Sequence, residues 1–361
     1  MRDRIRKRRL VAAGLLTALA ATGVVAALGL GRGGSSSAAE QVFRRGPVVL
    51  GTAFRIRAAE TDPTYRGQLL AHGYGSLTPE YEMQMDGLEP QRGIFNFVQA
   101  DRAVEFARAH GMTVRGHTLV WGKQLPSWLT RPSARWTRAT LLPVLQQWIR
   151  TVVAHYAGLV GEWDVVNEPL NDDGSLKRNL WERLIGPDYI RIAFETAHAT
   201  DPAAVLYIND YSTEWLDAKS NALYALARKL LGEGVPLGGI GFQVHSNTRT
   251  PVITRQLEAN MKRFGALRLR TDVTEMDVDM RTLTAAPQAK LRAQARIYAD
   301  AAQACASSPT CWTFTTWGFT DKYTWLGPAA QPLPFTARYA AKPAWQAITA
   351  RLGHHARANH V

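Results

Sequence analysis

The chain has 361 residues, which is longer than an average domain but within the range of a single (β/α) barrel. Hydrophobic residues make up 46% and charged residues 20%, a globular composition that is neither disordered nor collagen-like. The two cysteines exclude a disulfide-dense small scaffold and a four-cysteine zinc site, while the formal charge of +13 raises the question of a nucleic-acid partner.

The positive charge is unevenly distributed, because residues 1–39 hold seven basic residues and one acidic residue. The rest of the chain has 36 basic and 29 acidic residues, a net charge of +7, with no run of Lys and Arg interleaved with aromatics. A nucleic-acid-binding surface needs such a patch or stripe. We therefore expect no nucleic-acid partner.

Residues 1–39 have the layout of an export signal. A basic segment over residues 1–9 precedes an apolar run over residues 10–30, and Ser37 and Ala39 suit cleavage before Glu40. The apolar run is also long enough to span a bilayer, so an uncleaved anchor is the alternative. In either case we expect the domain over residues 40–361 to lie outside the cytoplasm, secreted or attached to the membrane by this segment alone.

From residue 48 onward, short β-branched runs alternate with amphipathic stretches. The predicted strands cover residues 48–54, 74–79, 113–120, 162–167, 205–209, 239–245, 267–275 and 312–317. The predicted helices cover residues 101–110, 142–156, 188–199, 217–231, 252–264, 286–304 and 341–352. This alternation favours parallel βαβ units, and eight of them predict a closed (β/α)8 barrel in one domain. A doubly wound open sheet is the alternative, although no glycine-rich phosphate loop follows the first strand.

The two cysteines, Cys305 and Cys311, stand six positions apart across a turn-forming Ser-Ser-Pro-Thr segment. In a protein outside the cytoplasm, such a pair most simply forms one small-loop disulfide. Two free thiols are the alternative.

In a (β/α)8 barrel, functional side chains lie at the carboxyl ends of the strands. Nearly every predicted strand ends at, or leads into, polar or aromatic residues: Glu80, His117, Trp121, Asn167, Glu168, Tyr211, Gln243, His245, Glu275 and Trp317. Their convergence at one rim predicts a binding cleft.

Glu168 and Glu275 end strands on opposite sides of such a barrel, so they can face each other across the cleft. Hydrolysis of a glycosidic bond needs this pair: a carboxylic acid that protonates the leaving oxygen, and a carboxylate that attacks or activates water. We expect the pKa of Glu168 to be raised by the negative charge of Glu275, which would keep Glu168 protonated.

Seven stretches occur in order along residues 45–352: TPEYEMQMDGLEPQRGIFNF, GHTLVWGKQLPSWL, WDVVNEP, YINDYSTE, GFQVH, TEMDV and TTWGFTDKYTW. Together they resemble glycoside hydrolase family 10, the β-1,4-xylanase family. The resemblance implies a (β/α)8 barrel and a retaining endo-β-1,4-glycanase that cuts xylan or a related plant polysaccharide by double displacement. It implies no cofactor and no metal.

The resemblance also implies a role for each matched residue. Glu168 matches the general acid/base, Glu275 the nucleophile, and His245 a histidine that hydrogen-bonds the nucleophile. Asp277 is expected to tune that histidine, and the cysteine pair matches a disulfide common in the family. The matched substrate contacts are Asn167 at the sugar 2-hydroxyl, His117, Trp121, Gln243, Trp317 and Trp325 around the −1 subsite, Glu80 on the glycone side and Tyr211 on the aglycone side.

Three stretches depart from the family pattern. Residues 80–85 read EYEMQM in place of Glu-Asn-x-x-Lys-Trp, so Tyr81 and Gln84 replace the Asn and the Lys. Residues 121–124 read WGKQ in place of Trp-His-Ser-Gln, so Gly122 replaces the His, and Leu326 replaces the Arg of a Trp-Arg pair. The lost Asn, Lys and His hold glycone sugars, so we expect activity on xylan to be weakened or redirected.

Two alternatives to a xylanase follow from these departures: a non-catalytic or weakly active β-glycan-binding barrel, and a hydrolase of a different β-glycoside. The presence of both Glu168 and Glu275 favours an enzyme over a binding protein. We expect a monomer whose partner is its polysaccharide substrate, xylan or a related β-glycan.

Overall fold

The computed structural model describes residues 46–131 and 135–353. The strands in these ranges are β1 (Val49–Phe54), β2 (Ser76–Pro79), β3 (Thr113–Val120), β4 (Glu162–Asn167), β5 (Val205–Asp210), β6 (Gly239–Phe242), β7 (His245–Asn247), β8 (Arg270–Asp279) and β9 (Thr313–Thr316). They pair in the order β6-β5-β4-β3-β2-β1-β9-β8-β7, and every paired strand runs parallel to its neighbour. A further pairing of β6 with β8 closes the sheet, which confirms the predicted (β/α)8 barrel.

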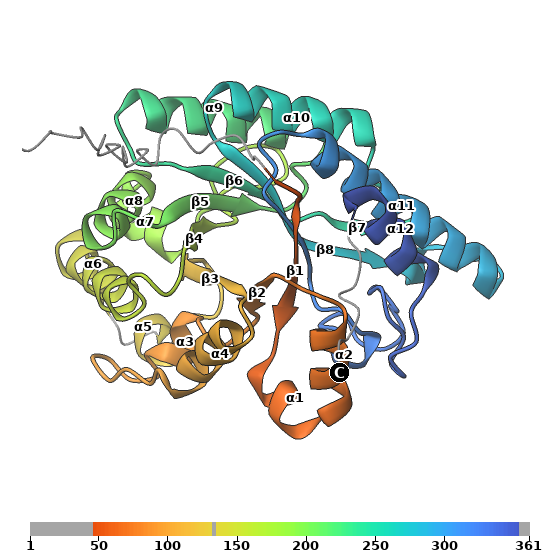
Figure 1. Cartoon of the computed structure of the whole chain (residues 1–361). Coiled ribbons are helices and arrows are strands. Elements are labelled where there is room, and N and C mark those ends of the chain that lie inside the picture. Colours follow the sequence, from red (N-terminus) through yellow and green to blue (C-terminus); the bar gives the residue numbers. More distant parts are fainter. Residues whose placement is uncertain (1–45, 132–134, 354–361) are drawn as a thin grey trace, which may run out of the picture. The chain divides into compact units, whose positions relative to one another are not determined.

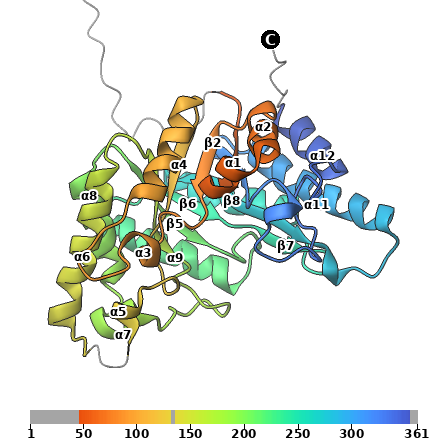
Figure 2. The same cartoon turned by 90° about the horizontal axis from the view of Figure 1, so that it is seen from below.

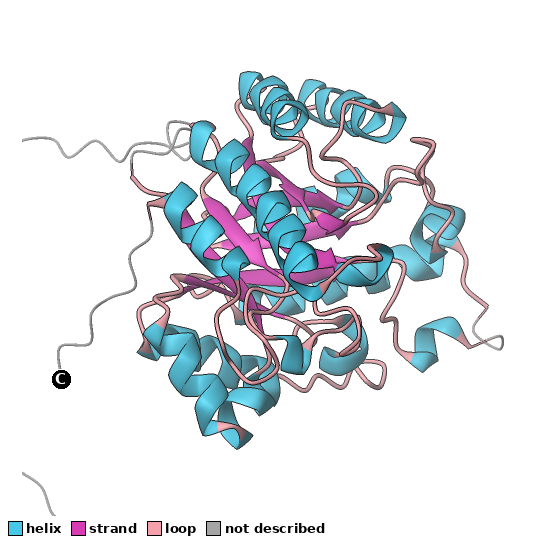
Figure 3. Cartoon of the chain, turned by 90° about the vertical axis from the view of Figure 1, so that its right-hand side faces the viewer, coloured by secondary structure: helices cyan, strands magenta, loops and turns pink. Residues whose placement is uncertain are grey.

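Helices surround the strands (Figures 1 and 3). The longer helices are α2 (Pro63–Ala71), α4 (Val98–Ala109), α6 (Arg138–His155), α8 (Tyr189–Thr200), α9 (Ala218–Gly232), α10 (Thr254–Ala266), α11 (Pro287–Ser307) and α12 (Pro343–Leu352). Helices α11 and α12 pack against each other, as two views of the chain show (Figures 1 and 2). The strands between the helices are buried almost throughout, because helices cover the outer face and side chains fill the interior.

Helix α2 was not predicted from the sequence, and neither were four short helices: α1 (Ile56–Thr61), α3 (Met85–Leu88), α5 (Ser127–Thr130) and α7 (Leu180–Ile185). The four short helices follow β1, β2, β3 and β4 respectively, so all four lie in segments that leave the carboxyl ends of strands. These segments build the rim at which a (β/α)8 barrel carries its functional groups.

Two predicted strands differ from the observed ones. The predicted strand over 239–245 is interrupted at Val244, whose φ of 59° lies in the left-handed region that a β-branched residue rarely adopts. The chain turns there and restarts as β7 at His245. The strand predicted to end at Glu275 continues to Asp279, because its last residues pair with β7. Glu275 therefore lies inside β8 and not at its end.

A buried ionic network fills the barrel interior below the cleft. Arg115 on β3 is 2% exposed, and its Nε donates a hydrogen bond of 3.1 Å to Asp164 on β4. Its guanidinium lies 4.1 Å from the ring centroid of Tyr207, whose hydroxyl donates to Asp272 at 2.7 Å. Because buried charges are stable only when they are paired, these contacts tie four strands together. Asp164 also accepts a 2.9 Å hydrogen bond from His117, which connects the network to the residues above it.

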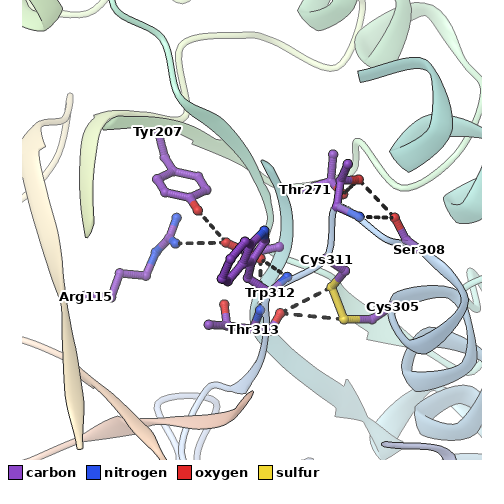
Figure 4. Close-up of a disulfide and its surroundings, with 10 residues drawn as sticks. Arg115, Tyr207, Thr271, Cys305, Ser308, Cys311, Trp312 and Thr313 are labelled. Atoms are coloured by element: carbon purple, nitrogen blue, oxygen red, sulfur yellow. Dashed lines mark hydrogen bonds and ion pairs between the residues drawn. A yellow bond between two sulfur atoms is a disulfide. The ribbon is translucent and has the colours of Figure 1, made fainter. Parts of the chain in front are cut away.

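The sequence prediction of a disulfide is confirmed, since Cys305 and Cys311 are bonded with their Cα atoms 5.3 Å apart (Figure 4). Cys305 lies in the last turn of α11, and Cys311 directly precedes the segment that enters β9. The carbonyl oxygen of Thr313 lies against both sulfur atoms. The bond therefore fixes the end of α11 to the start of β9.

In residues 46–131 and 135–353, no helix is both long and apolar enough to cross a membrane. The signal or anchor predicted for residues 1–39 lies outside the described residues.

Replacing Cys305 and Cys311 together by alanine should lower the free energy of unfolding by about 2 kcal/mol, because a bond that closes so short a loop removes about that much chain entropy from the unfolded state. Denaturant unfolding of the oxidised wild type and the double variant measures the difference. Equal stability of the two proteins would contradict a stabilising role for the bond.

Candidate active site

The polar residues at the strand ends line one cleft with a volume of about 450 Å³. The predicted residues that line it are Glu80 after β2, His117 on β3, Trp121 after β3, Asn167 on β4, Glu168 after β4, Tyr211 after β5, Gln243 after β6, His245 on β7, Glu275 on β8, and Trp317 and Trp325 after β9. Asp277 on β8 lies behind His245. Lys123 and Gln124 also line the cleft, although the sequence analysis assigned neither of them to the site.

Within the described ranges, no group of three or more His, Cys, Asp or Glu side chains is arranged to hold a metal ion.

Glu275 is in contact with side chains from three other strands, two of which hydrogen-bond its carboxylate. The amide of Asn209 on β5 donates to Oε1 of Glu275 at 2.6 Å, and Nε2 of His245 on β7 lies 3.2 Å from Oε2. Nδ1 of His117 on β3 lies 3.8 Å from Oε1. The side chain of Glu275 is only 5% exposed, so these contacts fix its carboxylate.

Asn209 connects the surroundings of the two glutamates. Its amide nitrogen donates to Oδ1 of Asn167 at 2.9 Å as well as to Glu275. Thr274 donates to Oδ1 of Asn209 at 2.6 Å, and Gln243 donates to Oδ1 of Asn167 at 3.2 Å. The sequence analysis did not assign Asn209 to the site. A signal was present, however, because this polar residue ends the predicted fifth strand.

His245 bridges Glu275 and Asp277. Its Nδ1 lies 3.1 Å from Oδ1 of Asp277, on the opposite side of the ring from Glu275. Burial opposes a charged imidazole, but the charges and hydrogen bonds of Asp277 and Glu275 outweigh burial and raise the pKa of His245 well above its usual value. The indole of Trp325 donates to the other oxygen of Asp277 at 2.8 Å. A charged His245 donates from Nε2 to Oε2 of Glu275, and its positive charge lies between the carboxylates of Glu275 and Asp277.

Glu168 directly follows β4 in a left-handed backbone conformation with φ of 53°. Its N–H donates to the carbonyl of Asn209 at 2.8 Å, which holds this uncommon conformation in place. Two ammonium groups lie against its Oε2 atom, Lys123 Nζ at 3.2 Å and Lys177 Nζ at 3.1 Å.

The expectation that the pKa of Glu168 is raised is wrong for this cleft. Burial does act to raise it, but the positive charges of Lys177 and Lys123 outweigh burial and lower the pKa of Glu168 below its usual value. The sequence analysis considered the negative charge of Glu275 and did not foresee that two lysines reach the carboxylate.

Arg55 pairs with Glu80 at the end of the cleft that the resemblance assigns to glycone sugars. Its Nε and Nη2 donate to the two oxygens of Glu80 at 2.7 and 2.8 Å, and its guanidinium lies 4.9 Å from the ring centroid of Tyr81. Gln84 donates to the carbonyl of Glu80 at 3.0 Å. The sequence analysis missed Arg55, although it is the first residue after the first strand.

The space beside Gly122 is already occupied. A Cβ atom at this position would lie 2.9 Å from Cβ of Asn179, which is closer than real Cβ atoms come. The side chain of Asn179 accepts a hydrogen bond from the N–H of Glu182 and caps α7. A side chain at position 122 would therefore displace Asn179, the residue that caps the start of α7.

Comparisons with known proteins agree with this geometry. The model of Glycosyl hydrolase family 10 matches residues 38–351. Endo-1,4-beta-xylanase B of Thermotoga neapolitana is 39% identical over 279 residues, which cover 76% of this chain and 80% of that protein. Endo-1,4-beta-xylanase A of Phanerodontia chrysosporium is 39% identical over 285 residues, covering 78% of this chain and 68% of that protein.

Among solved structures, native xylanase 10B from Thermotoga maritima matches with a TM-score of 0.80 and 38% identity, covering 88% of this chain and 97% of that chain. Together these similarities confirm the resemblance found in the sequence, and with it the prediction of a (β/α)8 glycoside hydrolase.

Asp277→Asn should lower the pKa of His245 toward its usual value, because it removes the negative charge next to Nδ1. The imidazolium would then lose its proton at lower pH than in the wild type. A ¹⁵N NMR titration of the ring measures this change directly. Asp279→Asn is the matched control, since Asp279 pairs with Arg281 and not with the ring. An unchanged His245 titration in Asp277→Asn would contradict the assigned network.

Proposed function

The chain belongs to glycosyl hydrolase family 10, and we propose that it is a retaining endo-β-1,4-xylanase working by double displacement with Glu275 and Glu168. The observation that carries this proposal is the presence of both carboxylates in one cleft, where the side-chain amide of Asn209 binds Glu275 and its backbone carbonyl binds the N–H of Glu168. The similarity to endo-1,4-beta-xylanases supports xylan as the substrate.

In the first step, a carboxylate oxygen of Glu275 attacks the anomeric carbon while Glu168 gives its proton to the departing glycosidic oxygen. The hydrogen bonds from Asn209 and His245 hold the carboxylate of Glu275 in one orientation before the attack. The products are a covalent glycosyl ester on Glu275 and a released sugar chain, with Glu168 left ionised.

In the second step, Glu168 takes a proton from a water molecule as that water attacks the anomeric carbon. The ester bond breaks, and Glu275 leaves as a carboxylate. Two inversions give net retention of configuration. Lys123 and Lys177 stabilise the ionised form of Glu168 that this step requires.

The cleft retains flat and polar groups suited to sugars. Trp317 lies with its ring centroid 5.1 Å from that of His117, and both line the cleft next to Glu275. Aromatic faces pack against the apolar C–H face of a pyranose ring, while Asn167 and Gln243 offer amide groups for its hydroxyls. At the Glu80 end, Arg55 already pairs with the carboxylate, so a sugar hydroxyl has to share it.

We further propose that the enzyme acts outside the cytoplasm. The basic and apolar layout of residues 1–39 supports export. The disulfide between Cys305 and Cys311 adds support, because such bonds persist mainly in oxidising compartments.

Purified protein should release reducing sugar from xylan, and Glu275→Ala should lower that rate by about four orders of magnitude, because the attacking group is lost. Azide should restore turnover of an activated aryl β-xyloside in both Glu275→Ala and Glu168→Ala, with the α-azide formed in the first variant and the β-azide in the second. Glu195→Ala, which removes an exposed helix carboxylate, is the control. Full xylanase activity in Glu275→Ala would falsify the assignment.

Gln84→Lys should raise kcat/KM on xylan by about tenfold, because a charged donor to a sugar hydroxyl is worth about 1–1.5 kcal/mol more than a neutral one. Gln84→Met, which fills similar space without a donor, should lower it. We test position 84 alone, because a side chain at Gly122 would displace Asn179. If neither variant changes kcat/KM, the contacts at this end of the cleft do not limit activity.

A further inference from the structure

Lys123 reaches the carboxylate of Glu168 from the rim of the barrel. It stands in the WGKQ segment after β3, at the position where the family pattern has Ser. Its side chain is 65% exposed, whereas the side chain of Glu168 is 8% exposed, so a solvated ammonium group extends inward to a nearly buried acid. The ammonium also lies 5.1 Å from the ring centroid of Trp121. In the described part of the chain, Glu168 is the carboxylate within ion-pair distance of Lys123.

Lys123 and Lys177 share one oxygen atom of Glu168. Both ammonium groups lie within 3.2 Å of Oε2, so two positive charges are balanced by one negative charge at this point. If Glu168 takes up a proton, both lysines lose their closest counter-charge. The ion pairs therefore favour the ionised form of Glu168 over the protonated form.

The other charged groups near the cleft do not cancel the effect of the two lysines on Glu168. The other titratable groups around the cleft are Arg55 after β1, Glu80 and Tyr81 after β2, His117 on β3, Asp210 on β5, Tyr211 after β5, Lys219 on α9, His245 on β7 and Glu275 on β8. Asp210 pairs with Lys219 at 3.1 Å, and Glu275 is in contact with His245. Glu168 therefore remains the nearest partner of both Lys123 and Lys177.

We propose that Lys123 is a positioning residue that holds Glu168 ionised in the free enzyme and thereby shifts the acid-catalysed half of the reaction to lower pH. The proposal rests on the proposed function, in which Glu168 must be protonated in the first step and ionised in the second. Lys123 opposes the first step at neutral pH and supports the second. Lys177 acts in the same direction, but it is less exposed and lies 4.5 Å from the ring centroid of Tyr211, so its removal also disturbs a sugar platform.

The test is the pH profile of kcat/KM for Lys123→Ser on an unsubstituted xylo-oligosaccharide, whose leaving group needs a proton. The alkaline limb of this profile reports the proton on the acid in the free enzyme. Without the ammonium group, Glu168 keeps its proton to higher pH, so kcat/KM on the alkaline side should rise by about three- to tenfold, as expected for loss of one partly exposed ion pair. Lys123→Arg keeps the positive charge, so the alkaline limb of its kcat/KM profile should lie at the same pH as in the wild type.

Lys229→Ser is the matched control. Lys229 on α9 is also 65% exposed and pairs with Glu233, so this variant removes the same charge at equal exposure but outside the cleft lining. Its pH profile should equal that of the wild type. An alkaline rise of the same size in Lys229→Ser would assign the effect to net charge and would overturn the role of Lys123.

A second substrate separates the two ways in which the proposal could fail. A 2,4-dinitrophenyl β-glycoside of xylobiose has a leaving group that departs without a proton, so formation of its glycosyl ester does not need the acid form of Glu168. The pH dependence of kcat/KM on this substrate should therefore be the same for wild type and Lys123→Ser, whatever its absolute value, and turnover by the variant shows that it is folded. Failure of the wild type on both substrates contradicts the proposed function. Normal activity with an unshifted oligosaccharide profile in Lys123→Ser, or equal shifts on both substrates, overturns the role of Lys123 alone.

Discussion

The side-chain amide of Asn209 is the contact on which the geometry of the cleft depends. Asn209 is fully buried, and its two N–H bonds go to different strands, one to Asn167 on β4 and one to Glu275 on β8. Its oxygen is fixed by Thr274, so the amide has one orientation. Because its backbone carbonyl also accepts from the N–H of Glu168, one residue of β5 sets the positions of both glutamates.

A chain of charged side chains runs from the barrel interior to Glu275. Arg115 neutralises Asp164 in the interior, and Asp164 accepts a hydrogen bond from Nδ1 of His117, the atom that lies 3.8 Å from Glu275. Burial opposes a charge on His117, but the carboxylates of Glu275 and Asp164 outweigh it and raise the pKa of His117. The carboxylate of Glu275 thus lies against two imidazoles with raised pKa, His117 and His245, and each of them is backed by a second carboxylate.

The sequence was sufficient to predict the barrel and most of the cleft, because both follow from local patterns. Parallel strands alternate with helices, and in a barrel their carboxyl ends meet at one rim, so a polar residue at a strand end is a candidate by position alone. Local patterns do not show where a chain bends or how far a side chain reaches. The break at Val244, which turns His245 toward Glu275, depends on pairing with β8. The contact of Lys177 with Glu168 depends on the path of the segment between β4 and α7.

The two glutamates are bound by different kinds of partner, and this difference affects how Glu168 gains and loses its proton between the two steps. Glu275 is hydrogen-bonded by short side chains of the barrel strands, Asn209 on β5 and His245 on β7. Glu168 is bound by Lys123 and Lys177, long side chains that come from the rim. A sugar ring on the aglycone side excludes water from Glu168, and burial is the influence that acts to raise its pKa. The same ring has to share space with the lysine ammonium groups. In the proposed cycle, a sugar ring that covered Glu168 would therefore favour the protonated form needed for the first step, and departure of the aglycone would favour the ionised form needed for the second.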